Sequence, residues 1–188
     1  MKGAEFSEFV NEIGQLAFYE CVSITNVTLP TALTSIGDYA FLYCDSLKEI
    51  AIPDLVRSIG QYAFFGCINL TRLSIGNGVE SMGRDAFNGC DNLKDVTLPQ
   101  YVCTNMLSSV FPSSYQSITN IVISDSVTNI GDSAFELCVN LENAVVGNGI
   151  TSIPYDAFYA CSNLTSVALN GNVTNIGQYA FMDCIKLT

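Results

Sequence analysis

The sequence predicts an α/β repeat solenoid, a right-handed superhelix of about eight 23-residue coils with a concave parallel β-sheet. Three observations predict this fold. The dipeptide Ala-Phe recurs at a fixed spacing, a cysteine follows the phenylalanine by three positions, and an extended run of alternating apolar residues separates successive pairs. We therefore expect residues 1–188 to form a single domain.

The positions of Ala-Phe set the repeat length. Successive pairs are 23 residues apart, except for one step of 48 residues. This long step contains a degenerate unit, in which Val110-Phe111 replaces Ala-Phe and Ser114 replaces the cysteine. We expect the phenylalanines of the regular pairs to be buried. The coils are thus centred on Phe18, Phe41, Phe64, Phe87, Phe111, Phe135, Phe158 and Phe181.

Each unit begins with an extended piece. Apolar residues at its first, fourth and sixth positions, many of them β-branched, favour a strand, which proline or Gly-Asn-Gly then ends. Such strands would stack about 4.8 Å apart in a parallel sheet, and their crossover connections make the superhelix right-handed. Examples are residues 47–52, 70–75, 93–98, 118–123 and 164–169.

A shorter extended piece and a turn complete the unit. Residues 33–37 and 127–131 are two of these short pieces, and each ends in a glycine that leads toward Ala-Phe-x-x-Cys. We expect this phenylalanine and cysteine to share one face of a single helical turn. Because one coil cannot bury its own apolar face, stacked coils should form a continuous core.

Leu-x-x-Ile-x-Ile-Pro followed by Val-x-x-Ile-Gly-x-x-Ala-Phe-x-x-Cys, as at residues 47–67, closely resembles the BspA-like leucine-rich repeat, also described as the Treponema pallidum type. The resemblance covers nearly the whole chain and implies a leucine-rich-repeat superhelix. Proteins of that family are typically large surface or secreted proteins of bacteria and mucosal protists. It therefore implies a non-catalytic protein-binding or adhesion module at the cell surface or in a secreted protein, with no catalytic residue to carry over.

An intracellular structural scaffold or spacer, located in the cytoplasm, is the alternative. It would explain why the first residues contain no signal-peptide-like apolar run. The chain opens almost directly into a coil at residues 9–14 and ends on residues 185–188, without the polar caps that solenoid ends need. We therefore expect the domain to be a fragment of a longer array.

Charge limits the class of partner. The chain has 18 acidic and 7 basic residues, and its formal charge of -11 would repel phosphate backbones and anionic lipid. No stretch approaches the roughly 20 apolar residues of a membrane-spanning helix. The composition therefore excludes nucleic acid and direct membrane insertion, and favours a protein or glycan ligand.

Metal and redox chemistry find little support in the residue pattern. Histidine is absent, and the closest cysteines, Cys90 and Cys103, are 13 residues apart, whereas zinc sites use Cys-x-x-Cys pairs. Equivalent cysteines could come within disulfide range, but they would point the same way, so we expect free thiols that pack as small hydrophobes. Residues 85–91 match a calcium loop poorly. We expect no catalytic, cofactor-binding or metal-binding residue and no cofactor.

The exposed third and fifth positions of the long strands are the predicted binding surface. The fifth position becomes apolar in three successive coils, and polar residues flank it, as at the core and edge of an interface. An alternative interpretation is that small β-forming residues simply suit an exposed strand. The partner-binding candidates are Asn120, Val122, Asn143, Val145, Ser166 and Ala168.

A rival surface lies beside the Ala-Phe turns. Aromatic and aliphatic residues recur there in consecutive coils, and aromatic side chains contribute strongly to interfaces. They could instead only cover one another. The rival surface comprises Leu16, Tyr19, Tyr39, Leu42, Tyr62 and Phe65.

Two further features concern the stacking itself. An asparagine precedes the leucine of four long strands, and we expect its amide to bind the backbone of the turn in the adjacent coil. The irregular unit, residues 101–117, should break the stacking and bulge out or bend the solenoid. Either a binding feature or drift would account for it. The four asparagines are Asn69, Asn92, Asn140 and Asn163.

Overall fold

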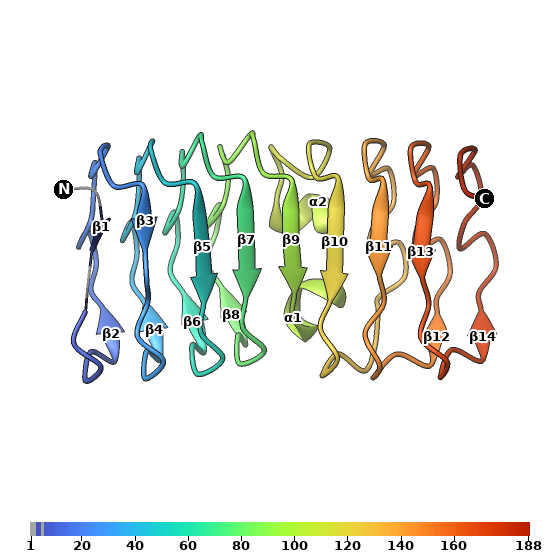
Figure 1. Cartoon of the computed structure of the whole chain (residues 1–188), viewed down its shortest axis with the longest axis horizontal. Coiled ribbons are helices and arrows are strands. Elements are labelled where there is room, and N and C mark those ends of the chain that lie inside the picture. The colour runs from blue at the N-terminus through green and yellow to red at the C-terminus, as the bar shows by residue number, and fades with distance from the viewer. Residues whose placement is uncertain (1–2, 5) are drawn as a thin grey trace.

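The computed structural model describes residues 3–4 and 6–188. It shows a parallel β-solenoid of about seven turns, whose coils follow one another along the long axis (Figure 1). The predicted solenoid of 23-residue coils is confirmed, and the count of eight differs from this description by one partial coil.

One parallel sheet runs the length of the described chain. Its neighbours pair with a register of 23 residues, as in Glu49 with Arg72, except between Asp95 and Asn120, where the register is 25. The two extra residues of the irregular unit are thus absorbed outside the sheet. In spatial order its strands are β1 (Gly3–Ala4), β3 (Asn26–Val27), β5 (Glu49–Ile52), β7 (Arg72–Ile75), β9 (Asp95–Leu98), β10 (Asn120–Ile123), β11 (Asn143–Val145) and β13 (Ser166–Ala168).

The short extended pieces form a second row of strands, which is interrupted. The predicted strand at residues 127–131 is wrong, because the neighbouring irregular unit places helix α1 (Gln100–Cys103) there instead of a short strand. Before the interruption lie β2 (Glu12–Ile13), β4 (Ser35–Ile36), β6 (Ser58–Ile59) and β8 (Ser81–Met82), and after it lie β12 (Ser152–Ile153) and β14 (Asn175–Ile176).

The Ala-Phe-x-x-Cys segment is not helical, which corrects the expectation of a single helical turn. Within residues 37–44, some N–H groups close tight turns, as from Cys44 to the carbonyl of Phe41 at 3.2 Å. The alternate N–H groups donate to the next coil, as from Phe41 to the carbonyl of Ala63 at 2.7 Å. A helix would use all of these donors within one coil, so pairing between coils replaces it.

This alternation places two residues of each regular turn in the left-handed region. One precedes the alanine and the other precedes the cysteine, as Tyr39 (φ 59°) and Tyr43 (φ 58°) do. Glycine occupies the second position in two coils, at Gly66 and Gly89. The other regular coils hold an L-residue there, at a cost of about 1–2 kcal/mol each, because the hydrogen bonds between coils fix the backbone.

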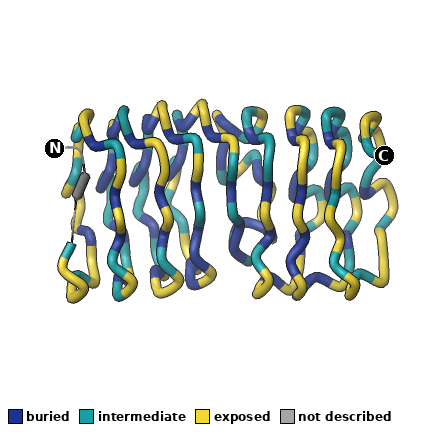
Figure 2. Tube along the Cα trace, in the orientation of Figure 1, coloured by how far each residue is buried: buried dark blue, intermediate teal, exposed yellow. Residues whose placement is uncertain are grey.

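Phenylalanine rings form the centre of the core. Phe41, Phe64 and Phe87 are fully buried and stack in parallel with centroids 5.0 Å apart. Phe18 and Phe181 are only partly buried, which corrects the expectation for the two outermost coils. Each of them lacks a complete coil of described residues on one flank. Figure 2 shows buried and exposed residues alternating along the strands between.

Cysteine completes the core by hydrogen bonding. The thiol of Cys67 donates to the carbonyl of Phe41 in the preceding coil at 3.3 Å, and that of Cys90 donates to Phe64 at 3.3 Å. All eight cysteines are free thiols, as expected. In the irregular unit Ser114 takes this place, and its buried hydroxyl has no hydrogen-bond partner among the described residues.

The asparagine ladder is confirmed at three of its four positions. The side-chain amides of Asn69, Asn92 and Asn140 donate to backbone carbonyls of the preceding coil at 2.8 to 2.9 Å. Asn163 instead donates to the side chain of Asn140 at 3.1 Å, because the backbone N–H of Asn163 already uses the carbonyl of Val139.

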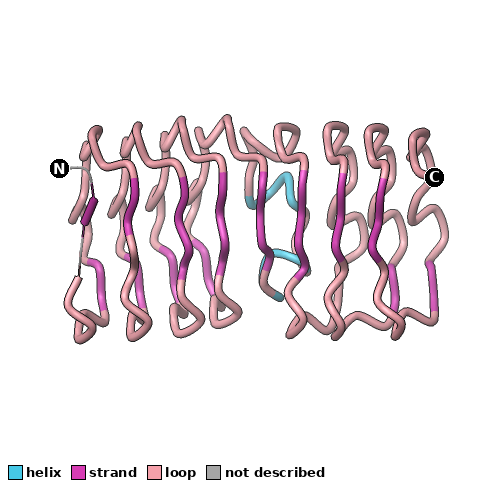
Figure 3. The backbone as a smooth tube through the Cα atoms, in the orientation of Figure 1, coloured by secondary structure: helices cyan, strands magenta, loops and turns pink. Residues whose placement is uncertain are grey.

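The irregular unit contains the helices of the described chain, α1 and α2 (Leu107–Val110), as Figure 3 shows. It is hydrogen bonded to the coil that follows it. The N–H of Gly131 donates to the carbonyl of Cys103 at 2.8 Å, and the N–H of Leu107 donates to the carbonyl of Ala134 at 2.7 Å. The side chain of Gln100 binds the same coil through Thr128 N and Asn129 O.

Candidate functional site

The six predicted partner-binding residues lie together on the long sheet. Asn120, Asn143 and Ser166 occupy one row across β10, β11 and β13, in direct register. Val122, Val145 and Ala168 occupy the next outward-facing row, two residues further along the same strands. Since side chains of a strand alternate between its faces, both rows face outward while the residues between them enter the core.

The first row is a chain of hydrogen bonds. The amide of Asn120 donates to the carboxylate of Asp95 at 2.6 Å, and the amide of Asn143 donates to the side-chain oxygen of Asn120 at 2.8 Å. The bond to the carboxylate is charge-assisted and therefore among the stronger ones. This network holds the amides in place, so the polar edge of the surface is pre-organised.

The second row is an apolar stripe. Val122 is 41% exposed and Val145 is 45% exposed. The two side chains lie next to each other on neighbouring strands. The stripe leads into a hollow of about 490 Å³, whose walls include Leu169, Asp125 and Asn148. The sheet therefore presents an apolar floor with polar groups at both ends.

Leu169, Asp125 and Asn148 belong to this surface but were not predicted. Leu169 occupies the sixth, normally inward position, yet it is 40% exposed because β13 is the last strand of the sheet in the described chain. Asp125 accepts a hydrogen bond from the N–H of Asn148 at 2.9 Å. A polar residue recurs three positions after Val122 and after Val145, and this recurrence could have identified Asp125 and Asn148 from the sequence.

The other half of the sheet is charged. Arg72 pairs with Glu49 at 3.3 Å, and both side chains are more than half exposed. Such exposed ion pairs contribute little to stability. Because these charges already neutralise each other, they offer a partner less than the apolar stripe does.

The rival surface is also present. The rings of Tyr39 and Tyr62 stack at 5.4 Å, and Phe65 meets Tyr62 edge-on at 5.5 Å. An open groove of about 580 Å³ lies beside Tyr19, Tyr39 and their aliphatic neighbours. The aromatic residues thus cover one another, as the alternative interpretation stated, while leaving part of their faces exposed.

Family membership follows from the repeat pattern in this geometry. The family model of the BspA-type leucine-rich-repeat region matches six copies, over residues 11–141 and 104–188. The chain belongs to the BspA-type leucine-rich-repeat family. No curated protein sequence matches it.

Solved structures of leucine-rich repeat proteins are similar to this one. A leucine-rich repeat protein of Treponema pallidum is 28% identical, with a TM-score of 0.49, and the match covers 95% of this chain and 72% of that one. A Bacteroides ovatus protein is 26% identical, with a TM-score of 0.47, covering 100% and 65%. One from Eubacterium ventriosum is 24% identical, with a TM-score of 0.59, covering 86% and 44%. This last match supports the fold alone.

The cysteines of this BspA-type array are poorly suited to act as nucleophiles. Burial raises the pKa of the Cys103 thiol to about 12. Burial is also the main reason why the pKa of Cys44 is raised to about 12, with a smaller contribution from its neighbours in the cysteine ladder. Thiolate is the reactive form of cysteine, so these thiols are protonated and inert at neutral pH.

In the described part of the chain, no group of three or more cysteine, aspartate or glutamate side chains is arranged to hold a metal ion. Nor does any helix there have the length and hydrophobicity to cross a bilayer.

Proposed function

We propose that this chain is a non-catalytic protein-binding module whose binding surface is the second half of the long sheet. The observation that supports it is the apolar stripe of Val122, Val145 and Ala168, which lies in register on three strands and opens into the hollow. Exposed apolar patches with polar rims are typical of protein interfaces.

The chemistry of the stripe favours a protein over a glycan. Two exposed valines offer apolar area, which a protein side chain can cover and a sugar hydroxyl cannot. The side chains of Asn120 and Asn143 would then hydrogen bond at the rim, where Asp95 already holds Asn120 and Asn120 holds Asn143. The binding screen described below also tests for a glycan ligand.

We further propose that this binding serves adhesion, either at the cell surface or as part of a secreted protein. It is supported by the family, whose members are typically surface or secreted proteins. The same proposal holds that residues 1–188 are one section of a longer leucine-rich-repeat array. An intracellular spacer built from the same repeats is the competing function.

The test is a binding screen with matched variants. Immobilised extracellular-matrix proteins and a glycan array would be probed with the chain, with Val122→Glu/Val145→Glu, and with Tyr39→Ser/Phe65→Ser. We expect a protein hit that the valine variant abolishes and the aromatic variant keeps, while circular dichroism shows both variants folded.

Other outcomes have separate meanings. Loss of binding in the aromatic variant alone would transfer the function to the rival surface. A hit confined to glycans would change the ligand class. The absence of any hit, together with concentration-dependent self-association in light scattering, would favour the spacer.

A further inference from the structure

The open edge of strand β8 is an unfilled place in the array. In regular coils the second residue of the short strand is hydrogen bonded to the next coil. The carbonyl of Ile36 accepts from the N–H of Gly60 at 2.8 Å, and the N–H of Tyr39 donates to the carbonyl of Gln61 at 2.9 Å. Short strand and turn are thus covered by an extended segment of the following coil.

Met82 and Asp85 occupy the same two places in the coil that precedes the irregular unit. The N–H groups of Ser81 and Gly83 donate toward β6, so the backbone groups of Met82, between them, point to the open side. β8 ends its sheet, and within residues 3–4 and 6–188 neither these groups nor the N–H of Asp85 have a partner. The Met82 side chain is partly exposed, whereas Ile36 is 1% exposed.

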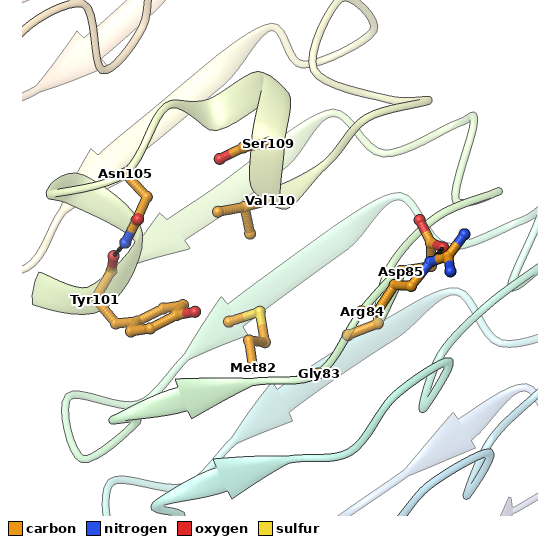
Figure 4. A pocket seen from close by; sticks show the side chains of 9 residues that line it. Met82, Gly83, Arg84, Asp85, Tyr101, Asn105, Ser109 and Val110 are labelled. Carbon is orange, nitrogen blue, oxygen red and sulfur yellow. Dashed lines mark hydrogen bonds and ion pairs between the residues drawn. The ribbon is translucent and has the colours of Figure 1, made fainter.

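The irregular unit leaves this edge open because it is bonded to its other neighbour. Its backbone pairs with the following coil at Gly131 and Ala134, whereas toward the preceding turn the hydroxyl of Ser113 accepts from Gly89 N. A cavity of about 250 Å³ lies in the resulting gap. Figure 4 shows Tyr101, Ser109 and Val110 of the irregular unit facing Met82 across it.

We propose that an extended peptide segment of a partner protein binds in this gap, adding to β8 as a parallel strand. The regular coils identify the occupant, since there an extended backbone supplies two acceptors and one donor in this register. Strand addition to an open edge is an established mode of peptide recognition. This site is separate from the long-sheet surface and does not rest on the proposed function.

The local charge favours a neutral backbone over an anion. The carboxylate of Asp85 lines the cavity, where it accepts from Arg84 at 3.0 Å and from Asn88 at 3.2 Å. Because Arg84 also lines the cavity and already pairs with this carboxylate, a ligand carboxylate or phosphate would find no unpaired positive charge there. Peptide groups instead match the unpaired donors and acceptor without adding charge.

The probe follows from the register of coil three. A synthetic acetyl-Ser-Ile-Gly-Gln-Tyr-amide, the sequence of residues 58–62, would place the Ser carbonyl on Met82 N–H, the Gly N–H on Met82 O and the Gln carbonyl on Asp85 N–H. The matched control replaces its glycine by N-methylglycine, which cannot donate. Titrations would be followed by NMR of the backbone amides, together with hydrogen exchange.

We expect the peptide to shift the amide signals of Met82 and Asp85 and to protect these amides from exchange. The N-methylated peptide should bind at least about tenfold more weakly. Ser109→Trp, which fills the cavity, should prevent binding, whereas Ser126→Trp on another turn should not. The proposal would be overturned if the two peptides bound with equal affinity or if the amides of Met82 and Asp85 did not shift. The same holds if glucose, added as a sugar probe in place of the peptide, shifted these amides.

Discussion

The ring of Tyr43 packs directly against Gly66 of the next coil: a Cβ placed on Gly66 would lie 2.5 Å from Cδ1 of that ring. Gly66 also has a φ of 71°. The equivalent residue of a later coil is Ala160, which holds a φ of 56° with a methyl group. The tyrosine ring, in addition to the left-handed backbone, therefore makes glycine necessary at position 66.

Gly66→Ala should lower the free energy of unfolding by about 2 kcal/mol, because left-handed strain and overpacking act together. In a Tyr43→Ala background the same change should cost about 1 kcal/mol, since only the backbone strain is left. Urea unfolding of the double-mutant cycle measures this coupling. Strictly additive effects of the two substitutions would contradict the contact.

Phe64→Ala should destabilise the chain by about 3–5 kcal/mol, because it empties the space between two stacked rings. Phe181→Ala should cost less, since Phe181 is partly exposed and stacks on Phe158 alone, at 5.3 Å. Thermal unfolding of both variants makes the comparison. An unchanged melting curve for Phe64→Ala would show that this ring is not part of the core.

Ser114→Ala should stabilise the chain by about 1 kcal/mol, because it removes a buried hydroxyl that has no partner in the described structure. Ser117→Ala is the matched control in the same unit. Its hydroxyl donates to the carbonyls of Leu93 and Ser114 at 3.0 and 2.8 Å, so its loss should destabilise. Denaturant midpoints that fell for both variants would place an unseen partner beside Ser114.

Raising the pH should expose the burial of Cys103. Its folded pKa of about 12 lies above the ordinary cysteine value of 9.0, so between these values the unfolded chain loses a proton that the folded chain keeps. Stability contributed by this thiol is complete below pH 9 and falls by about 1.4 kcal/mol per pH unit above it. Wild type should therefore lose stability faster than Cys103→Ala in unfolding measurements at pH 8, 9.5 and 10.5. Parallel slopes would argue against a buried thiol.

The sequence was sufficient for the fold because the repeat constrains it many times over. Each Ile, Leu and Phe of the 23-residue unit has an equivalent in nearly every coil, and their common register confirms the inward and outward assignment at Val122 and Val145. The turn conformation was missed because it depends on hydrogen bonds to the next coil, such as Phe41 to Ala63. No local pattern encodes those partners.

The irregular unit could be located but not folded from sequence. The loss of Ala-Phe at Val110-Phe111 and of cysteine at Ser114 marked its position. Its bonding to one neighbour alone follows from side chains such as Gln100, which reaches Thr128 in a different coil. Contacts of that kind have no counterpart in the repeat, so periodicity carries no information about them.

The split of the short-strand row between β8 and β12 has a consequence for how the coils of the array are coupled. In a solenoid each repeat is coupled only to its neighbours, and cooperativity passes along the array through those couplings. Here the coupling across the split includes the pairing of β9 with β10, the hydrogen bond from Gly89 N to the Ser113 hydroxyl and a tilted contact of Phe87 with Phe111 at 5.6 Å. The coils on the two sides are therefore coupled there through one row of strands instead of two.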